Sequence, residues 1–137
     1  MGQEGRRIVI VGGGFAGIGI AIRLKQRGIE DFLLLERAES VGGTWTYNTY
    51  PECRCDIPSH LYSFSFAPNP EWTQTYSSQP EIRRYLEDCV ERFGIASRVR
   101  TGVTLESAVL NIKGQNGKKV TNNKLPLNIP ACRARRG

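Results

Sequence analysis

A glycine-rich bend between an apolar run and a helical pattern constrains this chain more than any other feature. Ile8, Val9, Ile10 and Val11 follow one another without a polar residue, which predicts a strand over 7–11 that is buried in a parallel sheet. The GxGxxG segment over 12–17 comes next, and apolar residues then recur at helical spacing over 14–27. Strand, bend and helix in this order predict a dinucleotide-binding βαβ unit.

The three glycines of the bend have separate physical roles in such a unit. Gly12 makes the tight turn out of the strand, Gly14 leaves room for a pyrophosphate, and Gly17 lets helix and strand pack closely. The free N–H groups at the helix start then face the diphosphate. The fold class predicted from these residues is α/β, with a Rossmann-type βαβ unit and a parallel sheet. A generic glycine-rich turn is the alternative.

An acidic residue follows the second predicted strand, which covers 32–36. Glu36 stands 19 residues beyond Gly17, where a carboxylate can accept hydrogen bonds from the ribose hydroxyls of an adenosine. It would repel a 2′-phosphate, so this site should hold FAD or NAD rather than NADP. A solvated charge at a strand end is the alternative. The nearby Gly42-Gly43-Thr44-Trp45 stretch allows close approach of a ligand, although a simple turn explains it equally well.

The rest of the chain divides into an aromatic segment, a helix and a tail. The segment over 44–76 holds eight of the twelve aromatic residues without a clear period, so we expect an ordered, irregular excursion. An amphipathic helix is predicted over 78–93, with Ser78 and Glu81 forming a capping box and Gly94 ending it. Residues 99–109 favour a strand pair or one bent strand.

Charge and composition exclude several classes of function. The net charge of +6 belongs to the tail, because residues 107–137 hold seven Lys and Arg and no acidic residue. No motif that reads a nucleic-acid groove accompanies it, so no nucleic-acid partner is expected. The four cysteines form no CxxC pair and there is one histidine, so no metal site is assigned. No apolar run reaches about 18 residues; we expect no membrane span, free thiols and a cytoplasmic location.

Four stretches carry a family resemblance over roughly 100 residues. They are VGGGFAGIG over 11–19, LLLERAESVGGTW over 33–45, YPECRCDIPSHLYSFSF over 50–66 and YSSQPEIRRYLEDCVERF over 76–93. Together they resemble the N-terminal FAD-binding region of class B flavoprotein monooxygenases, particularly Baeyer–Villiger and flavin-containing monooxygenases. The resemblance implies FAD and NADPH as cofactors. It implies that O₂ and a small organic substrate are the reactants, and that a ketone or a heteroatom is oxygenated through a peroxyflavin.

The resemblance also implies roles for individual positions. Backbone at the helix start approaches the FAD pyrophosphate, Glu36 with Arg37 beside it holds the ribose, Thr44 and Trp45 line the flavin side, and backbone at Val103 contacts the adenine. The positions implied to contact FAD are Gly12, Gly14, Phe15, Ala16, Gly17, Glu36, Arg37, Gly43, Thr44, Trp45, Tyr62 and Val103.

A second group of positions is implied near the docking site of NADPH. Asp56 resembles the family's acid near the flavin, and Arg54 and Cys55 flank it. For Tyr62 and Cys55, packing is the alternative to cofactor contact, and for Arg54 it is a solvated loop charge. One position departs from the pattern, since Glu52 stands where the family has glycine. A positive φ there would cost about 1 kcal/mol.

The match is incomplete relative to the family fold with its two dinucleotide domains. No second GxGxxG occurs, and the family's catalytic arginine lies outside the matched region, so no catalytic residue is assigned. We therefore predict an FAD-binding domain over 1–110 that does not turn over alone. A non-catalytic FAD-binding remnant or a partner-dependent module is the alternative, and GGTW disfavours an NAD-dependent dehydrogenase. For the basic tail over 111–137, disorder and a truncated or frame-shifted reading frame are both open.

Overall fold

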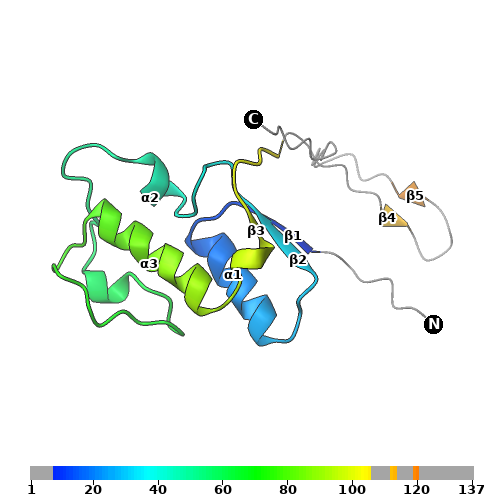
Figure 1. The fold of residues 1–137 in the computed structure, drawn as a ribbon, viewed down its shortest axis with the longest axis horizontal. Helices are drawn as coiled ribbons and strands as arrows, with labels where there is room; N and C mark the ends of the chain where they lie inside the picture. Colours follow the sequence, from blue (N-terminus) through cyan, green and yellow to red (C-terminus); the bar gives the residue numbers. More distant parts are fainter. Residues whose placement is uncertain (1–7, 106–111, 114–118, 121–137) are drawn as a thin grey trace.

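The computed structural model describes residues 8–105, 112–113 and 119–120 (Figure 1). It confirms the predicted order of strand, bend, helix and strand. In chain order the elements are β1 (Ile8–Val11), α1 (Phe15–Gln26), β2 (Phe32–Leu35), α2 (Thr44–Tyr47), the 3₁₀ turn η1 (Ser59–Leu61), α3 (Gln79–Arg92), the 3₁₀ turn η2 (Ala96–Arg98), β3 (Val99–Arg100), β4 (Ile112–Lys113) and β5 (Lys119–Val120).

A three-stranded parallel sheet forms the centre of the fold. β2 lies between β1 and β3, with Ile8 opposite Phe32 and Leu34 opposite Val99. Helix α1 connects β1 to β2, and the chain passes through α2, η1 and α3 before it returns to the sheet as β3 (Figure 1). This is the predicted α/β class with a Rossmann-like βαβ unit. Within the described segments no helix is long and apolar enough to cross a bilayer.

The C-terminal segment is described only in part. β4 and β5 pair antiparallel, with Ile112 opposite Val120, while 106–111, 114–118 and 121–137 lie outside the described residues. The predicted division into 1–110 and a basic tail over 111–137 therefore stays a prediction. The predicted strand over 99–109 is present as the two residues of β3, and its last four residues fall outside the described part.

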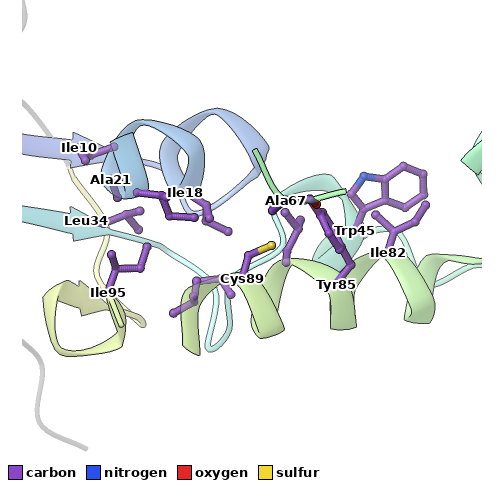
Figure 2. Close-up of a cluster of buried hydrophobic side chains, with 14 of the residues drawn as sticks. Ile10, Ile18, Ala21, Leu34, Trp45, Ala67, Ile82, Tyr85, Cys89 and Ile95 are labelled. Carbon is purple, nitrogen blue, oxygen red and sulfur yellow. The ribbon is translucent and has the colours of Figure 1, made fainter. Parts of the chain in front are cut away.

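One continuous core joins the sheet to both long helices (Figure 2). Leu34 of β2 belongs to the same buried cluster as Ile18 and Ile22 of α1. Ile82 and Leu86 of α3 continue this cluster. Gly28 and Gly94, just beyond the ends of α1 and α3, both have positive φ, a conformation typical of the residue after a helix. This confirms Gly94 as the predicted end of its helix.

The exposure of β1 differs from the prediction of a fully buried strand. Ile10 is 7% exposed, but Val9 and Val11 are 42% and 55% exposed. Side chains alternate between the two faces of a strand, and α1 covers the face that carries Ile10. Within the described residues nothing covers the opposite face, so an unbroken apolar run here does not mean burial on both sides.

The aromatic segment is ordered and largely irregular, as expected, although it contains α2 and η1. Its rings pack on one another and on the helices: the centroid of the Phe64 ring lies 4.9 Å from that of Phe66 and 5.2 Å from that of Phe15. The Tyr85 hydroxyl of α3 donates to the Ala67 carbonyl and accepts from Phe64 N–H, both at 2.8 Å. These contacts explain how an aperiodic segment folds against helices.

The capping box predicted at the start of α3 is wrong. The Ser78 side chain makes no cap hydrogen bond, and the Glu81 carboxylate instead accepts from Thr73 N–H at 2.8 Å. The backbone before α3 bridges to the segment around Arg54, so tertiary pairing replaces the local motif. At Glu52 the φ is 63°, so the condition for strain at this position is met. The Cys53 N–H donates to the Tyr50 carbonyl at 3.2 Å across this turn.

Candidate nucleotide-binding site

The first glycine bend has the tight geometry that its sequence predicts. Gly12 has a φ of 100°, a backbone conformation that side-chain-bearing residues rarely adopt. At Gly17 a Cβ atom would lie 1.8 Å from the Gly12 carbonyl oxygen, so no side chain can stand there without moving the bend. These two glycines set the close approach of α1 to the end of β1.

The second glycine pair packs directly on the first bend. A Cβ at Gly43, whose φ is 57°, would lie 2.9 Å from Gly14 Cα, and Gly42 N–H donates to the Gly13 carbonyl at 2.8 Å. The alternative of an unrelated turn is therefore set aside: the two glycine-rich segments meet backbone to backbone. Thr44 and α2 follow at once, so they stand beside the start of α1.

The start of α1 presents unpaired backbone donors. The first hydrogen bond of the helix runs from Ile18 N–H to the Gly14 carbonyl at 3.0 Å, and Gly14 as N-cap has no side chain to cap the turn. The N–H groups of Phe15, Ala16 and Gly17 consequently lack helical partners. Together with the helix dipole they favour an anionic group at this point.

Glu36 is the charged residue at the centre of this arrangement. It follows β2, is 4% exposed, and accepts hydrogen bonds from Gly13 N–H at 2.6 Å, Ala38 N–H at 2.7 Å and the Tyr47 hydroxyl at 2.9 Å. Burial acts to raise the pKa of the Glu36 carboxyl, but these hydrogen bonds outweigh it and leave the pKa below its ordinary value. The carboxylate is therefore ionised and fixed in orientation.

A groove of about 390 Å³ runs along these residues, a volume in the range of small-molecule sites. Its lining residues come from the ends of β1 and β2, the two glycine bends, α2 and the segment after β3. They are Val11, Gly12, Gly14, Leu35, Glu36, Arg37, Gly43, Thr44, Tyr47, Val103, Thr104 and Leu105.

The groove brings together seven of the fifteen positions predicted to contact a cofactor, namely Gly12, Gly14, Glu36, Arg37, Gly43, Thr44 and Val103. Val103 is held by its N–H, which donates to the Glu36 carbonyl at 2.9 Å. Sequence reasoning missed Tyr47. Its position one helical turn beyond Gly43 was the available signal, since that spacing returns a side chain to the same side of a helix.

Three other predicted positions form an aromatic cluster outside the groove lining. The Trp45 indole N–H donates to the Tyr62 hydroxyl at 3.1 Å, and the Phe15 ring meets the Tyr62 ring edge-on at 4.9 Å. Burial raises the pKa of the Tyr62 hydroxyl above its ordinary value, although the bond from Trp45 opposes the change. Of the remaining helix-start positions, Gly17 is buried against Gly12, and the Ala16 side of α1 faces a different hollow with Phe64 and Phe66.

The positions predicted near NADPH also lie away from the groove lining. The exposed Arg54 side chain donates to Glu52 Oε2 at 3.2 Å and to Gln74 Oε1. Cys55 is buried, and its N–H donates to the Ser77 carbonyl at 2.9 Å. Asp56 is exposed. Arg54, Cys55 and Asp56 thus lie on a segment separate from the groove at the glycine bends.

Comparison with known proteins places this geometry in a family. Residues 10–86 match the NAD(P)-binding Rossmann-like domain. The chain is 58% identical over 98 residues to a Baeyer–Villiger monooxygenase of Streptomyces coelicolor and 53% identical over 92 residues to one of Pseudomonas aeruginosa. These matches cover 72% and 67% of this chain but only 19% and 18% of the relatives. The chain therefore spans about a fifth of the length of these relatives.

Solved structures of monooxygenases are similar to this chain in fold as well as in sequence. An oxidised steroid monooxygenase bound to NADP superimposes with a TM-score of 0.72 at 35% identity, covering 82% of this chain and 24% of that one. A cyclohexanone monooxygenase in an open crystal structure gives a TM-score of 0.70 at 32% identity, covering 82% and 24%. The predicted resemblance is confirmed: this chain belongs to the NAD(P)-binding Rossmann-like domain family and is similar to the N-terminal part of Baeyer–Villiger monooxygenases.

Proposed function

We propose that this chain binds the ADP half of FAD in the groove, as the flavin-binding segment of an NADPH- and O₂-dependent monooxygenase that oxygenates a ketone or a heteroatom. The observation that carries the proposal is the fixed Glu36 carboxylate, held by Gly13 N–H at 2.6 Å beside the start of α1. One carboxylate and one set of free backbone donors thus lie at the same bend, which suits a sugar and a diphosphate joined to each other.

The residues present fit this half of FAD. A side chain at Gly43 would collide with Gly14. Neither position therefore carries a side chain that would keep a diphosphate away from the backbone. The helix start supplies N–H groups for the phosphate oxygens, and Glu36 supplies acceptors for the ribose hydroxyls. Val103, Thr104 and Leu105 line the groove and would flank the adenine.

FAD, when bound, supplies the redox chemistry of such enzymes by taking electrons from NADPH and passing them to O₂. The part of this chain in the groove orients and holds the nucleotide. Trp45 and Tyr62, joined by the 3.1 Å hydrogen bond, would lie toward the flavin, as the resemblance implies. Arg54, Cys55 and Asp56 would then act toward NADPH. No residue is proposed to be catalytic.

FAD titration of the purified full-length chain tests the proposal. We expect binding that quenches flavin fluorescence, and at least a tenfold weaker Kd in Glu36→Gln, because an amide offers a single acceptor oxygen in place of two. Glu39→Gln is the matched control, since Glu39 is exposed and outside the groove lining. ADP should compete, whereas its 2′-phosphorylated form should compete poorly. A chain that takes up no FAD, or a Glu36→Gln variant that binds it as well as the original, would refute the assignment.

A non-catalytic module is a second candidate, and one observation favours it. Val9 and Val11 leave one apolar face of β1 open in the described part of the chain, as in a segment that functions against a further domain. NADPH consumption by the FAD-loaded chain, measured with and without a ketone, tests the module. Consumption that a ketone stimulates would exclude the non-catalytic module, whereas FAD binding without consumption is the result that both a module and an isolated flavin-binding segment predict.

A further inference from the structure

Tyr47 of α2 contacts the same carboxylate that the proposed function assigns to the ribose. Its hydroxyl donates to Glu36 Oε1 at 2.9 Å and accepts a longer hydrogen bond, 3.4 Å, from Arg37 Nε. The Arg37 guanidinium also lies 5.2 Å from the centroid of the Tyr47 ring. The tyrosine is 48% exposed and lines the groove together with Gly12 and Gly43, so its hydroxyl lies on the ligand side of Glu36.

A count of acceptor positions shows why this contact matters. A carboxylate offers about four lone-pair positions. In Glu36, Ala38 N–H and the Tyr47 hydroxyl use Oε1, and Gly13 N–H uses Oε2. At most one acceptor position remains, because the Arg37 backbone also interacts with this carboxylate, but a ribose diol donates two hydrogen bonds. Both ribose hydroxyls can be accepted only if at least one present donor leaves.

Of the three donors, only the Tyr47 hydroxyl is free to leave. The N–H groups of Gly13 and Ala38 belong to backbone that is fixed next to β1 and β2, and Gly13 further accepts from Gly42 N–H at 2.8 Å. Tyr47 instead is half exposed and ends a four-residue helix. Its side chain can turn toward solvent by a change of rotamer without moving the backbone.

We propose that Tyr47 is an internal competitor of the nucleotide: its hydroxyl occupies the acceptor on Glu36 that the second ribose hydroxyl requires, and binding displaces it. This inference rests on the proposed function. Displacement sacrifices a hydrogen bond to a charged group, so it lowers affinity for every ligand that presents a ribose diol. It also adds a donor to the buried Glu36 carboxylate when no nucleotide is bound, which lowers the cost of burying its charge.

Tyr47→Phe tests the inference because it removes the hydroxyl and keeps the ring. The Kd of ADP would be measured by calorimetry for the full-length chain, for Tyr47→Phe and for Tyr76→Phe. Tyr76 is the matched control, since it is 47% exposed and does not line the groove. We expect Tyr47→Phe to bind ADP about 5- to 20-fold more tightly, and Tyr76→Phe to bind it like the original chain. With 2′,3′-dideoxy-ADP the gain should disappear.

The outcomes separate this inference from the proposed function. If the original chain binds ADP and Tyr47→Phe binds it no more tightly, or gains equally for the dideoxy analogue, the competition is refuted and the nucleotide site stands. If neither the original chain nor either variant binds ADP or FAD, the nucleotide site itself fails and the competition fails with it. Tighter binding that depends on the ribose hydroxyls supports both.

Discussion

Gly17→Ala is the most direct test of the architecture around the bend. The new Cβ would lie 1.8 Å from the Gly12 carbonyl oxygen, whereas close C···O contacts are about 3.3 Å or longer. The two groups must therefore separate by about 1.5 Å. Gly12 cannot move freely, because its N–H donates to the Leu35 carbonyl at 2.8 Å. Either this hydrogen bond is lost or the start of α1 moves off the sheet.

The magnitude follows from opposing terms. Alanine is preferred to glycine in a helix by about 1 kcal/mol, which favours the variant. Overpacking of this severity costs about 3 kcal/mol or more, and a broken backbone hydrogen bond adds about 1 kcal/mol. We expect a net loss of about 3 kcal/mol in the free energy of unfolding. For a domain of this size that corresponds to a fall in Tm of about 12 °C or more.

The assay is urea and thermal unfolding of the full-length chain, followed by far-UV circular dichroism. Gly19→Ala is the control in the same helix, because it has the same gain in helix preference. Its Cβ would meet the edge of the Phe64 ring at 3.0 Å, a contact that a shift of a few tenths of an ångström relieves, so its stability should change by less than about 1 kcal/mol. Equal stabilities for the two variants would refute the reasoning that Gly17 sets the approach of α1 to the bend.

Three further predictions follow from single residues. Glu52→Gly should raise the unfolding free energy by up to about 1 kcal/mol, since Glu52 has a φ of 63°; Glu52→Ala, which keeps a Cβ, should show no such gain in the same urea titration. Tyr85→Phe should cost about 2 kcal/mol, because its hydroxyl makes two 2.8 Å hydrogen bonds, and an equally stable variant would contradict their contribution. The pKa of Glu36 is lower in the folded chain than its ordinary value, so in acid the unfolded chain binds more protons than the folded one. The stability contributed by this carboxylate should therefore be present at neutral pH. It should be lost as the pH falls below about 4.5 and through the folded-state pKa. In unfolding measured against Glu36→Gln, a difference that already vanishes near pH 6 would exclude this account.

The elements that depend only on neighbouring residues were predicted from the sequence pattern. The apolar run before Gly12, the helical spacing after Gly14 and the stripe of α3 each arise from the period of one element, and all three are present. The capping box failed for the opposite reason. The Glu81 carboxylate bonds Thr73 N–H, a partner eight residues away that is positioned by the packing of the aromatic segment.

The amino-acid sequence alone determined that a strand, a glycine bend and a helix follow one another, and that a glutamate follows the next strand. Each of these features depends on residues that lie only a few positions apart. Only the tertiary structure decided that the second glycine pair packs on the first bend and that Tyr47 shares the Glu36 carboxylate. These contacts join segments that are distant in sequence, and their geometry is set by how the sheet and helices close on one core. For the same reason the exposure of Val9 and Val11 depends on what packs against the sheet rather than on the apolar run that contains them.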